Sequence, residues 1–248
     1  MKTRYALVTA AVVAGALLAP TAAFAQTDTT STTVARGARR AERQSAAADE
    51  VKSRCLNQID RRQKALSAEK ARMQNAKFLT DAHQSALEAI NDQTSSGLAT
   101  LADTIQGEDN FEQLRAECRQ IVEDYRVFAL VRPRTRLVLA SDRELAAVTK
   151  LNGVADRIQS AIDKAKADGH DTTQAEASLA TMRAAIASAS DHADGVYAAV
   201  IDLKPADYNA NNHVLDAPRS DVRAARDNLK QAVASGRDAR HALKAGSA

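Results

Sequence analysis

Hydrophobic residues recur every three or four positions along most of the chain, with polar and charged residues between them. The clearest stripe lies in segment 175–203 and consists of Ala175, Leu179, Met182, Ile186, Ala189, Ala193, Val196, Val200 and Leu203. This spacing puts all nine positions on one helix face and is typical of a coiled-coil seam. Similar stripes in 111–128, 148–165 and 222–243 predict further helices.

Six helical segments are predicted from Arg36 onward, and no segment shows convincing strand character. The first helix is less regular than the others, because Gln63 and Lys70 interrupt its apolar stripe. Long helices with short connections favour antiparallel neighbours. We therefore predict an all-α fold of elongated antiparallel helical bundles, with two consecutive three-helix, coiled-coil-like units at residues 41–132 and 133–248.

Residues 1–25 have the pattern of a secretory signal peptide. Lys2 and Arg4 precede an apolar core that is shorter than the about 20 residues of a membrane span, and small residues stand before Gln26. We expect cleavage there and an exported product without a transmembrane segment, secreted or associated with the cell envelope. Residues 26–40 begin with Thr, Asp and Ser, which predicts a disordered linker.

Charge and aromatic content narrow the choice of partners. Loss of Lys2 and Arg4 lowers the formal charge from +3 to +1, and the chain has no Trp and only 3% aromatic residues. Bases stack on aromatic side chains, so we expect no nucleic-acid partner. Residues 36–72 carry eleven Lys or Arg against five Asp or Glu. The candidate site for an anionic envelope polymer or lipid is Arg36, Arg39, Arg40 and Arg43; the alternative is a solvated helix start.

Cys55 and Cys118 are the only cysteines, and an exported protein favours a disulfide over a metal site or a nucleophile. Three helices in up-down-up order, at about 1.5 Å per residue, place the two cysteines at nearly the same level. We therefore predict a structural disulfide between them.

Segment 125–145 differs from the rest of the chain, because two dense apolar runs flank Pro133. The favoured interpretation is a proline-kinked helix that joins the two units; a β-hairpin that turns at the proline is the alternative. A more specific hypothesis is that a binding groove lies where the two units join. Its candidate residues are Tyr125, Phe128, Arg132, Arg134 and Arg136.

Motifs for catalysis or metal binding are weak. In loop 207–216, Asp207, Asn209 and Asn211 match the first ligands of a calcium-binding loop, but Pro218 stands where a bidentate Glu is needed. An Asx-rich turn that caps helix ends explains the same residues. The histidines are scattered, and no phosphate-binding or hydrolase motif occurs. We predict no metal, no cofactor and no enzymatic activity.

Three stretches, "TDAHQSAL", "DYRVFALVRPRTRLVLASD" and "PADYNANNHVL", occur in this order after the signal peptide. They resemble an uncharacterised family of secreted helical proteins from high-GC Gram-positive bacteria. The resemblance covers most of the mature chain and implies export and a helix boundary near Thr80. It implies no catalytic or binding residue.

The sequence therefore predicts an exported, non-enzymatic helical-bundle protein that acts as a cell-envelope structural or protein-interaction scaffold. Its partner would be an unknown protein or envelope polymer. Electrostatic binding through the Arg-rich first helix is the alternative. A ligand or metal carrier, or a hydrolase, is a second alternative, which would need a convergent polar site.

Overall fold

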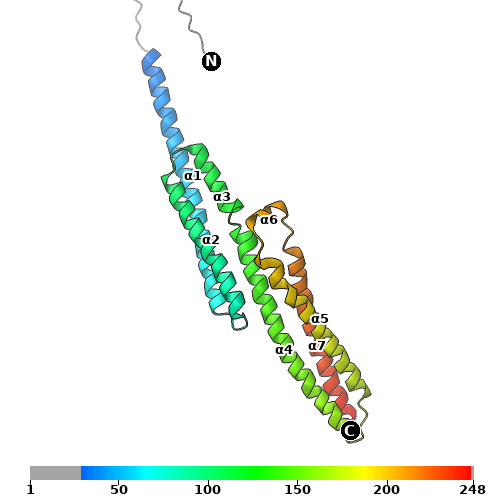
Figure 1. Cartoon of the computed structure of the whole chain (residues 1–248). Coiled ribbons are helices and arrows are strands. Elements are labelled where there is room, and N and C mark those ends of the chain that lie inside the picture. The colour runs from blue at the N-terminus through cyan, green and yellow to red at the C-terminus, as the bar shows by residue number, and fades with distance from the viewer. Residues whose placement is uncertain (1–28, 247–248) are drawn as a thin grey trace, which may run out of the picture. The chain divides into compact units, whose positions relative to one another are not determined.

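The structure, a computed structural model, describes residues 29–246, and every secondary-structure element in that range is helical (Figure 1). The predicted all-α helical bundle is therefore confirmed. The elements are α1 (Thr29–Gln74), α2 (Asp81–Gly107), α3 (Phe111–Glu123), the π-helical turn η1 (Val127–Val131), α4 (Arg132–Ala167), α5 (Thr173–Ile201), α6 (Pro205–Ala210) and α7 (Asp216–Gly246).

The chain divides into two units, of which the first ends at Arg43 and the second begins at Gln44. In the first unit α1 already starts at Thr29, so the linker predicted for residues 26–40 is corrected to helix from Thr29 onward. Ala and Arg are frequent after residue 33, and both favour helix, which propagates cheaply once nucleated. The predicted signal peptide, residues 1–25, lies outside the described residues.

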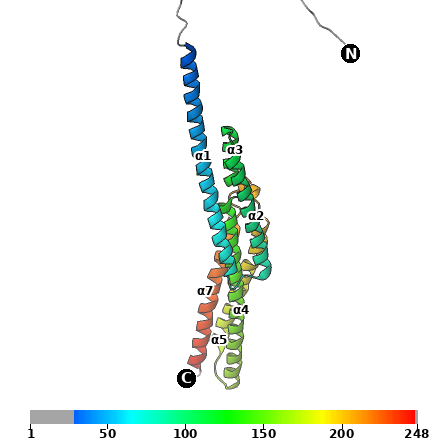
Figure 2. The same ribbon diagram turned by 90° about the vertical axis from the view of Figure 1, so that its left-hand side faces the viewer.

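In the second unit, α4, α5 and α7 form a three-helix bundle (Figures 1 and 2). The seam predicted in α5 is confirmed, because all its positions from Ala175 to Val200 are buried and Leu203 is half-buried. They pack against large residues of the two neighbouring helices, such as Ile158 and Leu229. Burial of these apolar side chains therefore stabilises the packing of the three helices.

The part of α1 from Gln44 onward packs with α2 and α3 around a second core. The two residues that interrupt its apolar stripe bind α2. The Nε2 of Gln63 donates to the carbonyl oxygen of Ser95 at 2.7 Å, and the Nζ of Lys70 lies 2.8 Å from the carboxylate of Asp92. The irregular pattern of this helix therefore reflects polar contacts between helices rather than a break.

A third core joins the two bundles and contains Met73, Leu87, Leu130, Val138 and Val200. These residues come from α1, α2, η1, α4 and α5, so buried apolar surface is continuous across the join. The boundary predicted between residues 132 and 133 accordingly falls inside one compact unit, which extends from Gln44 onward.

The helical path from α3 to α4 is interrupted at Arg126, and a helix runs through Pro133, where the sequence predicts a kink. Arg126 has φ 40°, in the left-handed region, whereas Pro133 stands in the first turn of α4. The π-helical turn η1 lies just before this proline, and its last bond runs from the N–H of Arg132 to the carbonyl oxygen of Val127. The alternative β-hairpin is not formed, since residues 127–145 are helical throughout.

Asn209 of α6 binds both sides of the interruption at Arg126. Its Nδ2 donates to the carbonyl oxygen of Glu123 at the end of α3, and its Oδ1 accepts from the Nε of Arg126. The guanidinium of Arg126 also lies over the ring of Tyr208. The Asx-rich segment therefore caps a helix end, as predicted, and these contacts offset the cost of a left-handed arginine.

Candidate functional site at the helical junction

A groove of about 690 Å³ opens on the second unit where the end of α1 meets α4. We call it the junction groove. Its apolar residues are Ala68, Ala71, Ala76, Phe78, Leu79, Leu139 and Ala140. Its basic residues are Arg72, Lys77, Arg136, Arg143 and Arg226, the last of which comes from α7. Asn75 is the one remaining lining residue, so the lining contains no carboxylate.

The turn between α1 and α2 forms one wall of the groove. Leu79 is buried and anchors this turn in the third core, whereas the adjacent Phe78 is 43% exposed. The Nζ of Lys150 lies 4.9 Å from the centroid of the Phe78 ring. Thr80 then caps α2 by accepting from the backbone N–H of His83. The local sequence thus buries one apolar residue of the turn and presents the next one to solvent.

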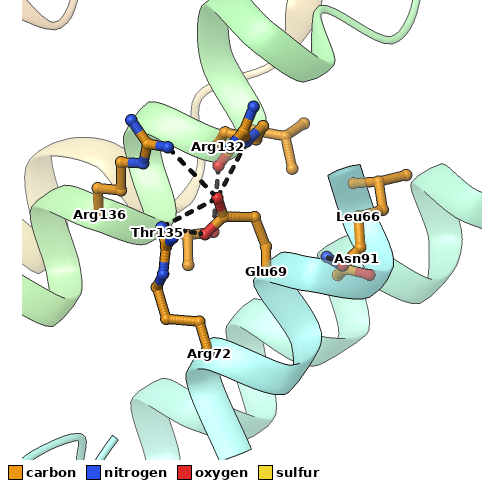
Figure 3. Close-up of polar contacts among 8 residues, drawn as sticks. Leu66, Glu69, Arg72, Asn91, Arg132, Thr135 and Arg136 are labelled. Atoms are coloured by element: carbon orange, nitrogen blue, oxygen red, sulfur yellow. Dashed lines mark hydrogen bonds and ion pairs between the residues drawn. The ribbon is translucent and has the colours of Figure 1, made fainter. Parts of the chain in front are cut away.

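A buried carboxylate, Glu69, lies beside the groove and gathers three arginines (Figure 3). The Nε of Arg132 donates to its Oε1 at 3.0 Å, and an Nη of Arg72 donates to both of its oxygens at 3.2 Å. An Nη of Arg136 lies 3.8 Å from Oε1. Glu69 itself is fully buried, so these contacts replace the water that its charge would otherwise require.

At the end of the groove near Arg143 and Arg226, basic side chains outnumber the carboxylates that pair with them. Arg226 pairs with the buried Glu144 at 3.3 Å. Among the described side chains, neither Arg143 nor Lys77 has a carboxylate within ion-pair distance. The junction groove therefore combines an apolar floor with a net positive rim, which suits an amphipathic anionic partner.

The five groove residues predicted from segment 125–145 do not form one site. Arg136 lines the junction groove, whereas Tyr125 and Arg134 line a second cavity of about 600 Å³. Phe128 is exposed, and the guanidinium of Arg132 lies over its ring at 5.6 Å from the centroid. Helical periodicity separates Arg134 from Arg132 and Arg136, because positions two residues apart on a helix do not face each other.

Arg134 is buried in the wall of the second cavity and donates to the carbonyl oxygen of Leu203. Burial lowers the pKa of Arg134, and the charge of Asp202 partly opposes this shift. Burial also raises the pKa of Tyr125, with a smaller contribution from Asp124. The cavity lining contains Asp124, Asp202 and Lys204 as well, so its charges are mixed and favour no single class of ligand.

The predicted polyanion-binding residues lie in the first unit. Arg36, Arg39, Arg40 and Arg43 all belong to α1 and are exposed. Their spacing of three, four and seven residues places them on one face of the helix. Glu42 is exposed on the same helix. The four arginines thus form one exposed helix face. The anionic partner expected for that face stays a prediction.

The predicted disulfide is confirmed. Cys55 of α1 and Cys118 of α3 are bonded, with their Cα atoms 5.7 Å apart. Cys55 is buried, and Cys118 packs at the edge of the same core. The bond therefore fixes the first and third helices of this bundle to each other.

A histidine–aspartate pair near the groove was not predicted. The buried carboxylate of Asp142 lies 2.9 Å from the Nδ1 of His83 and accepts from the backbone N–H of Thr80 at 3.0 Å. The His83 ring stacks on Tyr197 with 3.7 Å between centroids. These contacts join the start of α2 to α4 and α5. Because 59 positions separate the pair in sequence, no local pattern indicated it.

The described residues, 29–246, show neither a metal-binding cluster nor a membrane-spanning helix. Within them, no group of three or more His, Cys, Asp or Glu side chains is placed to hold a metal ion. No helix in that range combines the length and apolar character needed to cross a membrane.

The groove residues that sequence analysis missed are Arg72, Lys77, Phe78, Arg143 and Arg226. Phe78 offered the best signal, because it is a rare aromatic residue in a short turn between two helices. The basic residues gave no signal, since each stands in a mixed-charge helical segment or turn. Only the packing of α1, α4 and α7 brings them together.

Comparison with protein-family models, with curated proteins and with solved structures finds no match for this chain. The resemblance to secreted helical proteins of high-GC Gram-positive bacteria therefore stays a prediction.

Proposed function

We propose that this protein is an exported, non-enzymatic interaction scaffold of the cell envelope, and that it holds its partner in the junction groove. One observation carries the proposal. Five cationic side chains surround an apolar floor that includes an exposed phenylalanine, and no carboxylate lines the groove. Large exposed apolar residues within a charged rim are typical of binding surfaces.

The polar groups that do converge support binding rather than catalysis. Glu69 is occupied by arginines from α1 and α4, and Asp142 by His83 and the backbone of Thr80. Both arrangements join helices to each other, so they act as fixed supports beside the groove. Export is supported by the pattern of residues 1–25 and by the disulfide, which is typical of oxidising compartments.

Electrostatic attachment through the first unit is a second candidate. The observation in its favour is the exposed arginine face formed by Arg36, Arg39, Arg40 and Arg43. Such a face would bind an anionic polymer or lipid surface with an affinity that falls as salt screens the charges.

Co-sedimentation of the disulfide-bonded protein with purified cell-envelope material, at several salt concentrations, tests both candidates. The scaffold proposal expects Arg143→Glu to reduce binding, while replacement of the four arginines of the first unit by Ala leaves it unchanged. The electrostatic candidate expects the opposite result, with loss of binding at high salt. Absence of binding by the unaltered protein at every salt concentration would overturn both.

Arg157→Glu is the matched control for the groove variant. Arg157 is exposed on α4, as Arg143 is, but it does not line the groove. Equal losses from both variants would indicate a general effect of charge and count against the scaffold proposal.

A further inference from the structure

The junction groove is built from two helix faces that run alongside each other for about two turns. On α1 the lining positions are Ala68, Ala71, Arg72 and Asn75, and on α4 they are 136, 139, 140 and 143. Both sets have the spacing of one helical stripe. Small side chains at the centre of each stripe leave room for the close approach of another helix.

The positive charge is distributed along the groove. Arg72 and Arg136 lie together at one end, where both contact Glu69. Arg143 is seven residues further along α4, about 10.5 Å along the helix axis. Arg226, whose partner Glu144 adjoins Arg143, marks the same end. Anion-binding groups therefore stand at two levels, two helical turns apart.

From this distribution we propose that the occupant of the junction groove is an acidic amphipathic helix of a partner protein. Carboxylates seven residues apart on such a helix have the spacing of Arg136 and Arg143, and its small apolar face would lie on Ala71, Ala140 and Phe78. This is the helix-in-groove mode of recognition, in which apolar anchors bind and flanking charges set the register. A lipid with a single anionic headgroup would pair with the basic residues at only one end of the groove.

This inference rests on the proposed function and names the chemistry of its partner. The probe is a pair of labelled helical peptides of about 21 residues, long enough for a stable helix. One carries Glu at seven-residue spacing on both sides of an Ala/Leu stripe, and the other carries Lys at the same positions. Fluorescence anisotropy measures their binding to the disulfide-bonded protein.

We expect the Glu peptide to bind and the Lys peptide not to bind. Arg143→Glu should weaken binding about tenfold or more, the effect of replacing one attraction by a repulsion. Ala71→Phe should weaken it similarly, because the new ring would occupy the floor of the groove. Ala71 and Arg143 are both exposed, so neither change disturbs the core. Arg157→Glu is again the control and should bind as the unaltered protein does.

Failure of the Glu peptide to bind, or equal binding of both peptides, would overturn the inference. So would binding that both groove variants leave unchanged. Phosphatidylglycerol vesicles provide a further arm: if they bind in a groove-dependent manner and the peptide does not, the occupant is a lipid and the inference is wrong. In that case, groove-dependent binding to envelope material would still support the proposed function. Failure of the inference is therefore distinguishable from failure of the proposed function.

Discussion

The Nε of Arg132 donates to the Oε1 of Glu69 at 3.0 Å and thereby joins the first turn of α4 to α1. Glu69 is fully buried, whereas the side chain of Arg132 is about a quarter exposed, at 26%. Arg72 and Arg136 complete the surroundings of the carboxylate. One buried acid thus organises the wall of the groove and leaves its arginines partly available to solvent.

Removal of the charge of Glu69 should destabilise the protein. In Glu69→Gln, three arginines lose their shared carboxylate and repel one another. Breaking a buried pair costs about 3–5 kcal/mol, but these arginines can turn toward water, so we expect a loss of about 2 kcal/mol. Urea unfolding followed by circular dichroism measures it. Glu42→Gln, an exposed change on the same helix, should have no effect, and an equally stable Glu69→Gln protein would contradict the interpretation.

The disulfide should contribute a large share of the stability of the second unit. Its cysteines are 63 positions apart, and closing a loop of that length stabilises by about 4 kcal/mol in the chain-entropy model. We therefore expect a comparable loss in the double variant Cys55→Ala/Cys118→Ala, measured by urea unfolding. Adding a reductant should lower the unfolding midpoint of the unaltered protein and leave that of the double variant unchanged. A midpoint insensitive to reductant would refute the prediction.

Gly97 should not tolerate a side chain, although it lies inside a helix. A Cβ at this position would stand 2.7 Å from the Cε1 of Tyr125. Replacing a helical glycine by alanine normally stabilises by about 1 kcal/mol, but crowding of this kind costs about 1–3 kcal/mol. We expect a net loss of about 1 kcal/mol in Gly97→Ala, measured as a shift in the unfolding midpoint.

Gly153→Ala is the matched control, because a Cβ there would have no atom within 4 Å. It should stabilise the protein by about 0.5–1 kcal/mol. In a Tyr125→Ala background the cost of Gly97→Ala should disappear, since the clash is removed. Stabilisation by both alanine variants in the unaltered background would show that Tyr125 does not oppose Gly97.

Acid should weaken the connection between α4 and α5. Hydrogen bonds from Lys166 and from Thr172 lower the pKa of Glu176. A carboxyl whose pKa is lower in the folded state contributes stability above its unfolded value of about 4.3, and loses it as the pH falls through the folded pKa. The urea midpoint should therefore fall less steeply with acid in Glu176→Gln than in the unaltered protein.

Glu123→Gln is the control for this measurement. Glu123 is exposed on α3 and has no ion-pair partner among the described side chains. Its replacement should leave the acid dependence unchanged. An unchanged slope in Glu176→Gln would show that this carboxylate contributes nothing to acid sensitivity.

Helical periodicity alone predicted the helices and most of their buried faces. The stripe of α5 is buried from Ala175 to Val200, and that of α7 is buried at Val222, Ala225 and Leu229. Helix length also predicted that Cys55 and Cys118 lie at nearly the same level, as their disulfide requires. These features depend on spacing within a helix, which is local, and on helix rise, which is constant.

The sequence by itself determined the all-helical class, the buried stripes and the disulfide, because a regular helix converts residue number directly into direction and height. Tertiary structure alone decided that the helical path is interrupted at Arg126, since Asn209, which binds Arg126 and Glu123, comes from distant α6. It also decided which arginines share Glu69 and which line the groove. Long-range charge contacts leave no periodic pattern, so only the packing of α1, α4 and α7 reveals them.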